Sequence, residues 1–69
     1  MSDIGHGIMV RRAMLRMSQA RLAREIGVKQ AYISLLESGE RPLNDGLIQK
    51  IAVALRCKPE DFAKWQQAA

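Results

Sequence analysis

The residue types that most often carry out catalysis or bind metals are scarce in this 69-residue sequence. It contains one cysteine, Cys57, and one histidine, His6, so it can form neither an internal disulfide nor a cysteine-rich metal site. We find no set of acidic and basic side chains suited to acid–base catalysis, and no glycine-rich loop that would hold a phosphate. The sequence therefore indicates a protein that is not an enzyme and needs no metal, cofactor or small-molecule ligand.

The basic side chains are more informative. The chain has 11 lysine and arginine residues against 7 aspartate and glutamate residues, a net charge of +4. The excess is uneven, because residues 1–37 carry six basic side chains against three acidic ones. A basic half is typical of proteins with an anionic partner, most often nucleic acid, although solvated basic helices without a partner are also common.

Composition and length limit the architecture to one small domain. Hydrophobic residues make up 48% of the chain and charged residues 26%, as in folded globular proteins. No apolar run approaches the ~20 residues that cross a bilayer, and no basic stretch precedes an apolar one as in a signal peptide. We expect a single cytoplasmic domain over residues 1–69 without a membrane partner, with an N-terminal arm (1–7) and a C-terminal tail (66–69).

The spacing of apolar residues predicts five helices and no strand. Ser18 is a good N-cap for the second helix, and Gly27 is a good C-terminal cap for it. Asn44 or Asp45 would cap the fourth helix, and Pro59 suits the first position of a short fifth helix. The first four predicted helices cover residues 8–14, 19–26, 30–37 and 45–55.

Two small residues, Ala23 and Gly27, lie near the junction of the second and third predicted helices. Helices joined by a turn of three or four residues must cross steeply to reach one core, which brings their backbones close together. Ala23 leaves room for this contact, and Gly27 can take the positive φ that the turn needs. The pattern predicts a helix-turn-helix whose second helix protrudes from the domain.

The segment SQARLAREIGVKQAYISLLESGERP, residues 18–42, resembles the helix-turn-helix of the lambda-repressor-like family, which includes phage repressors and Cro proteins. LIQKIAVALRCKPEDF, residues 47–62, is similar to the fourth and fifth helices of that family, so the resemblance extends over residues 8–62. It implies an all-α fold, a compact five-helix lambda-repressor-like domain. It also implies a transcription regulator that binds double-stranded DNA in a sequence-specific way.

The resemblance places the third helix in the major groove of DNA. Carried over by position, the residues that contact bases are Gln30, Ala31, Ser34 and Leu35. Gln30 can pair bidentately with adenine, whereas Ala31 and Leu35 would contact thymine methyl groups or leave room. For Leu35, an exposed leucine of no consequence or a contact with another protein is an equal alternative.

The same resemblance implies a set of contacts with DNA phosphates. Gln19 would donate to a phosphate and brace Gln30 across the turn. Lys29 replaces the usual serine or threonine at the N-cap of the third helix, and a phosphate contact would explain a cation there. The expected backbone contacts are Ser18, Gln19, Lys29, Arg41, Asn44 and Arg11.

Two further positions concern the fold. Arg16 stands where the family usually has glycine, and a left-handed conformation there would cost roughly 1 kcal/mol. Arg12 and Glu37 match positions that form a buried ion pair in some family members. Such a pair would tie the first helix to the third.

A single third helix in the major groove reads only about four or five base pairs, so we expect a homodimer on a palindromic operator. We expect the interface in the C-terminal part of the chain, at Leu43, Phe62 and Trp65, although Phe62 is also a good core residue. The alternative is an antitoxin or adaptor whose main role is to bind a partner protein. The sequence does not distinguish a repressor from an activator, or a phage, restriction–modification or toxin–antitoxin context.

Overall fold

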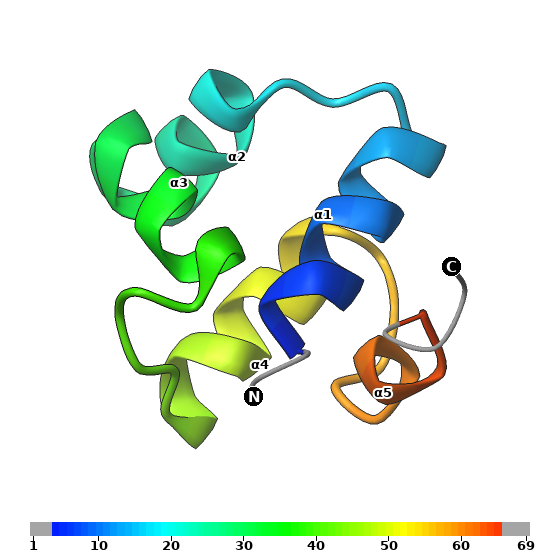
Figure 1. Cartoon of the computed structure of the whole chain (residues 1–69). Helices are drawn as coiled ribbons and strands as arrows, with labels where there is room; N and C mark the ends of the chain where they lie inside the picture. Colours follow the sequence, from blue (N-terminus) through cyan, green and yellow to red (C-terminus); the bar gives the residue numbers. More distant parts are fainter. Residues whose placement is uncertain (1–3, 66–69) are drawn as a thin grey trace.

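Five helices account for most of residues 4–65, the part of the chain that the computed structural model describes, with the side chain of Trp65 left out (Figure 1). They are α1 (Ile4–Met14), α2 (Gln19–Ile26), α3 (Gln30–Ser38), α4 (Asp45–Ala54) and α5 (Asp61–Trp65). Residues 4–65 contain no strand, so the predicted all-α, five-helix fold is confirmed.

α1 runs through the middle of the molecule. It packs against α3 on one side and α5 on the other, while α2 packs against α3 and α4 (Figure 1). All five helical segments contribute to one apolar core. Burial of apolar surface in such a core stabilises the folded state by about 25 cal/mol for each Å² removed from water. The core residues are Ile8, Met17, Leu22, Ala23, Ile33, Leu36, Ile51, Ala52, Leu55 and Phe62.

α1 begins at Ile4, four residues earlier than predicted. The expected N-terminal arm over residues 1–7 is therefore wrong for residues 4–7, and residues 1–3 lie outside the described part. Gly5 and Gly7 are buried, because a helix turn without side chains can lie directly against neighbouring backbone. The glycines led to the prediction of an arm here, because glycine is less favourable in a helix than alanine by up to about 1 kcal/mol.

The turn between α2 and α3 has the predicted form. Ser18 is the N-cap of α2, and its Oγ accepts a hydrogen bond from the Arg21 N–H (3.0 Å). Gly27 ends α2 with a φ of 81°, and its N–H donates to the carbonyl of Ala23. Ala23 is buried as predicted, but Gly27 is exposed, so glycine serves the backbone conformation there and not close packing.

Two arginines adopt the left-handed conformation that favours glycine. Arg16, after α1, has a φ of 54°, as the resemblance to the family implied. Arg56, after α4, has a φ of 57°, which the sequence reading missed. A non-glycine residue in this region costs roughly 1 kcal/mol, and both arginines lie in tight turns.

α4 begins after the N-cap Asn44, whose Oδ1 accepts a hydrogen bond from the Leu47 N–H (2.8 Å). α5 begins at Asp61 and not at Pro59, because residues 58–60 form a separate tight turn in which the Asp61 N–H donates to the Lys58 carbonyl (2.9 Å). The N–H of Lys58 donates to the carboxylate of Asp61, and this bond, with the ammonium group of Lys64, lowers the pKa of Asp61.

Candidate nucleic-acid interface

α3 presents one face to the core and the other to solvent. Ile33 and Leu36 are almost fully buried, whereas Gln30, Ala31 and Ser34 are exposed. Their spacing places these three exposed residues together on the outer side of the first two turns. The structure thus brings three of the four expected base-contacting residues onto one accessible face.

Leu35, the fourth of these residues, is only half-exposed and lies at the edge of that face. Its carbonyl accepts hydrogen bonds from the N–H groups of Glu40 (2.9 Å) and Arg41 (3.2 Å). These bonds fold the loop after α3 back onto the helix. A smaller fraction of Leu35 than of Gln30, Ala31 or Ser34 is accessible to a partner.

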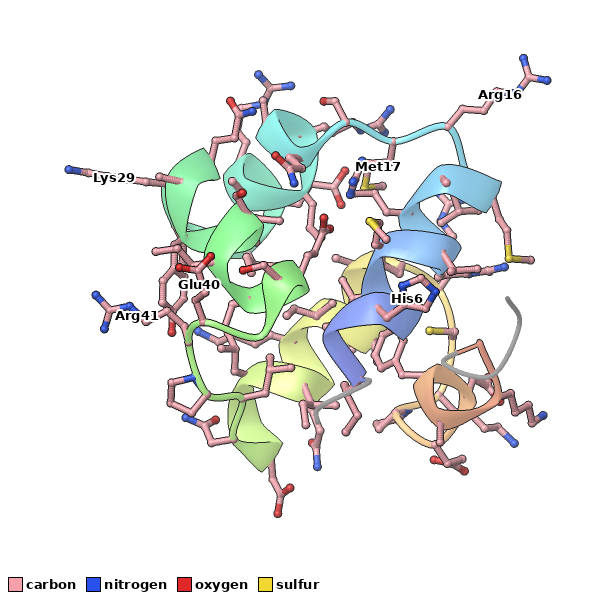
Figure 2. All side chains as sticks on the ribbon, viewed as in Figure 1. His6, Arg16, Met17, Lys29, Glu40 and Arg41 are labelled. Atoms are coloured by element: carbon pink, nitrogen blue, oxygen red, sulfur yellow. The ribbon has the colours of Figure 1, made fainter. Side chains whose placement is uncertain are left out.

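Lys29 and Arg41 flank the outer face of α3. Both side chains are exposed and extend away from the body of the molecule on the same side (Figure 2). Within residues 4–65 neither forms an ion pair. Lys29 also makes no capping hydrogen bond as the N-cap of α3, so its ammonium group is available to an anion.

The amino end of α2 supplies a second group of donors. Its first-turn N–H groups have no partners within the helix. We expected the side chain of Gln19 to brace Gln30. It instead donates from Nε2 to Glu37 Oε1 (2.9 Å). The bracing prediction is wrong because the carboxylate is a charged acceptor within reach, and charged acceptors form stronger hydrogen bonds than amides.

Glu37 is the centre of a hydrogen-bonded cluster that joins three helices. Arg12 Nε donates to Glu37 Oε2 (2.8 Å) and Arg12 Nη2 donates to Glu37 Oε1 (3.1 Å), so the predicted ion pair is present and bidentate. Arg12 Nη1 also donates to the carbonyl of Met17 (2.8 Å). The side chains of Arg12 and Glu37 are 16% and 4% exposed, so the pair fixes the orientation of α3 relative to α1 in a largely dry environment.

Asn44 and Arg11 have roles in the fold. Asn44 is exposed and uses its Oδ1 as the cap of α4, which leaves its amide NH₂ able to donate to a phosphate. Arg11 instead donates to the carbonyls of Leu55 (3.0 Å) and Arg56 (3.3 Å) at the end of α4, where a cation favours the helix dipole. These bonds tie α1 to the end of α4, and the expected phosphate contact of Arg11 stays a prediction.

The three residues expected at a dimer interface have different environments. Phe62 is fully buried in the core, so its assignment to the interface is wrong. It occupies the core because α5 lies directly against α1. Leu43 is half-buried at the edge of the core, and the side chain of Trp65 lies outside the described part of the chain.

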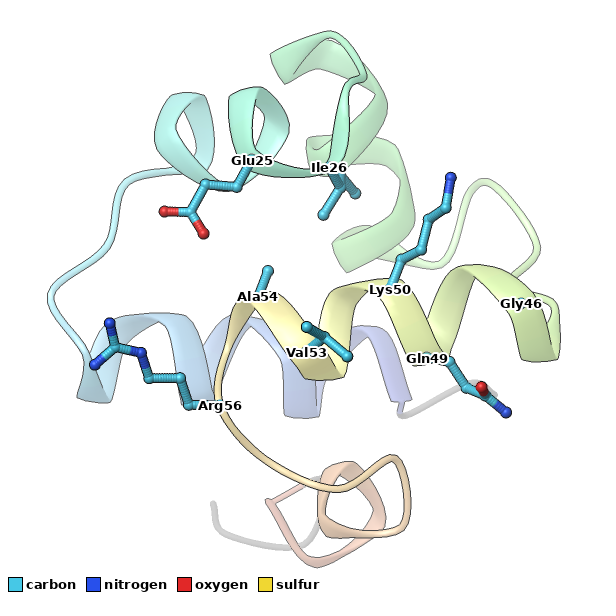
Figure 3. A pocket seen from close by; sticks show the side chains of 8 residues that line it. All are labelled: Glu25, Ile26, Gly46, Gln49, Lys50, Val53, Ala54 and Arg56. Carbon is cyan, nitrogen blue, oxygen red and sulfur yellow. The ribbon is translucent and has the colours of Figure 1, made fainter.

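A hollow between α2 and α4 was not anticipated (Figure 3). None of the expected DNA contacts borders it, and Val53 on its wall is 78% exposed. Its lining residues are Glu25, Ile26, Gly46, Gln49, Lys50, Val53, Ala54 and Arg56. In the part of the chain that the structure describes, no three His, Cys, Asp or Glu side chains are grouped as a metal ion would require.

The packed pair α2–α3, the exposed outer face of α3 and the helices that support the pair define a helix-turn-helix DNA-binding domain. The model of a helix-turn-helix family matches residues 8–62, or 55 of the 69 residues. The chain belongs to this lambda-repressor-like family, whose members bind DNA and regulate transcription. Among residues 4–65, no helix has the length and apolar character of a membrane span.

Proposed function

We propose that the protein is a sequence-specific transcription regulator that inserts the amino-terminal half of α3 into the major groove of DNA. The observation that carries this proposal is the exposed outer face of α3 between two cations, Lys29 and Arg41, which extend on the same side (Figure 2). A major groove about 12 Å wide accommodates one helix. The cations would then lie near the phosphates on its two walls.

Base reading is assigned to the outer face of α3. The amide of Gln30 at the start of the helix matches the N7 acceptor and N6 donor of adenine. Ala31 would contact a thymine methyl group, and Ser34 would donate to or accept from a base edge. Leu35, at the edge of this face, would contact a second thymine methyl group. The proposed half-site is therefore rich in A·T pairs.

The contacts with the DNA phosphate backbone would fix the register of α3 in the groove. We assign them to Lys29 and Arg41 as cations, Ser18 and Gln19 through the first turn of α2, and Asn44 through its amide. These groups come from three segments around α3. They would hold the helix at one depth without reading sequence.

A homodimer on a palindromic operator completes the proposal. One α3 has nine residues and reaches only a few base pairs, whereas two copies separated by one DNA turn, about 34 Å, read a full site. Leu43 is the described residue that we retain for the dimer contact. We propose that the protein acts in the cytoplasm without catalysis and without a cofactor.

Selection of bound DNA from a random pool tests the proposal, with wild type, Gln30→Ala and the control Gln49→Ala. Gln49 is an exposed glutamine of α4 that borders the hollow and not the outer face of α3. We expect two-fold symmetric sites for wild type and Gln49→Ala, and loss of preference at one symmetric pair of bases for Gln30→Ala. A wild-type pool that never enriches would contradict the proposal and favour the antitoxin or adaptor alternative, which stays a prediction.

A further inference from the structure

Two glycines in the first turn of α1 are in backbone-to-backbone contact with other helices. A Cβ atom built on Gly5 would overlap the carbonyl oxygen of Leu36 and lie 3.0 Å from that of Glu37. A Cβ atom on Gly7 would overlap the carbonyl oxygen of Phe62. The other three glycines of the chain show no such overlap, so the two contacts are a local property of this turn.

The contact of Gly5 is made with the helix that carries the proposed base-reading residues. Leu36 and Glu37 belong to the last turns of α3, which begins at Gln30. Peptide carbonyls in a hydrogen-bonded helix cannot rotate away as a flexible side chain can. An atom added at position 5 must therefore displace the backbone of α1, of α3 or of both.

α3 has few other ways to absorb such a change. Its buried face is packed around Ile33 and Leu36, and Glu37 is held by both Arg12 and Gln19. Protein interiors are close-packed and transmit strain, so a tightly packed helix tends to shift as a unit. A displacement on the order of 1 Å at the carboxyl end would tilt a helix about 13 Å long as a whole.

We infer that Gly5 is a positioning residue for sequence recognition, because it sets how closely α3 lies against α1. Binding groups must be held within about 0.5 Å of the productive geometry, which is less than the displacement that a methyl group would force. This inference rests on the proposed function. It adds that a residue of α1, remote from the outer face of α3, controls how well that face discriminates between bases.

Gly7 provides a matched control within the same helix turn. Its added Cβ would overlap backbone to the same degree, but the backbone belongs to Phe62 of α5, which carries no proposed base contact. Glycine to alanine raises helix propensity equally at both positions. The two variants therefore differ mainly in which helix they displace.

The test compares wild type, Gly5→Ala and Gly7→Ala by competition between the selected site and the same site changed at the bases under α3. The readout is the ratio of the two affinities. Partial unfolding lowers both affinities by the same factor, so the ratio does not report a simple loss of stability. We expect Gly5→Ala to reduce the ratio about tenfold or more, the loss of one well-made base contact, and Gly7→Ala to change it less than about twofold.

If Gly5→Ala keeps the wild-type ratio, or if Gly7→Ala lowers it equally, the inference is wrong while the proposed function stands. If wild type itself shows no preference, the proposed function has failed. Should Gly5→Ala be mostly unfolded, both variants are measured again in the background of Arg16→Gly. This change stabilises the domain because it removes the backbone strain of an arginine in the left-handed conformation, and it lies outside α3. The same ratios then decide the outcome.

Discussion

At the scale of single residues, the carboxylate of Glu37 joins α3 to both α1 and α2. It accepts two hydrogen bonds from Arg12 and one from Gln19, and its side chain is 4% exposed. Glu37→Gln keeps the shape but leaves the guanidinium of Arg12 without a counterion. We expect a loss of about 3 kcal/mol in the free energy of unfolding, because breaking a buried pair leaves an uncompensated charge.

Thermal denaturation followed by circular dichroism measures this loss, which corresponds to a drop in Tm of at least about 10 °C in a domain of this size. Glu40→Gln is the control, since Glu40 is exposed and its carboxylate only accepts a bond from Ser38. It should change stability by less than about 0.5 kcal/mol. Equal stability of wild type and Glu37→Gln would show that the pair does not hold the fold.

At the scale of helices, the start of α3 combines poor capping with an exposed cation. Lys29 is the N-cap but makes no capping bond, and its ammonium group stands at the positive end of the helix dipole. Lys29→Ser should therefore raise the free energy of unfolding by about 1 kcal/mol. The same change should weaken DNA binding and reduce the slope of log affinity against log salt by about 1, because one phosphate contact is lost.

Urea denaturation and binding isotherms at several salt concentrations measure the two effects on one protein sample. Lys50→Ser serves as the control, because Lys50 is exposed within α4 and borders the hollow. It should lower stability slightly through helix propensity and leave the salt slope unchanged. A gain in stability together with unchanged binding would mean that Lys29 does not meet a phosphate.

The helix boundaries show where sequence patterns suffice. Caps such as Ser18, Gly27 and Asn44 act through local hydrogen bonds and backbone angles, so the sequence predicts them correctly. The start of α1 at Ile4 is not favoured by local propensity, because glycine is a poor helix former, and Gly5 lies directly against the backbone of α3. Local propensity contains no information about such a contact.

At the scale of the whole molecule, the outer surface of α3 was predictable and its supports were only partly so. The periodicity of Ile33 and Leu36 requires the opposite face to be exposed. The bond from Gln19 to Glu37 and the seating of Arg11 on the end of α4 depend on the three-dimensional arrangement of helices far apart in sequence. The hollow beside Val53 likewise follows from the crossing of α2 and α4, which no local pattern specifies.

The central claim is that Gln30 on the outer face of α3 reads a base in the major groove. The most direct measurement is a double-mutant cycle between Gln30→Ala and a selected site in which 7-deaza-adenine removes the N7 acceptor of the contacted adenine. We expect each change alone to weaken binding about tenfold and the two together to weaken it hardly further, because both remove the same contact. Fully additive losses, or no effect of the modified base on wild type, would contradict the claim.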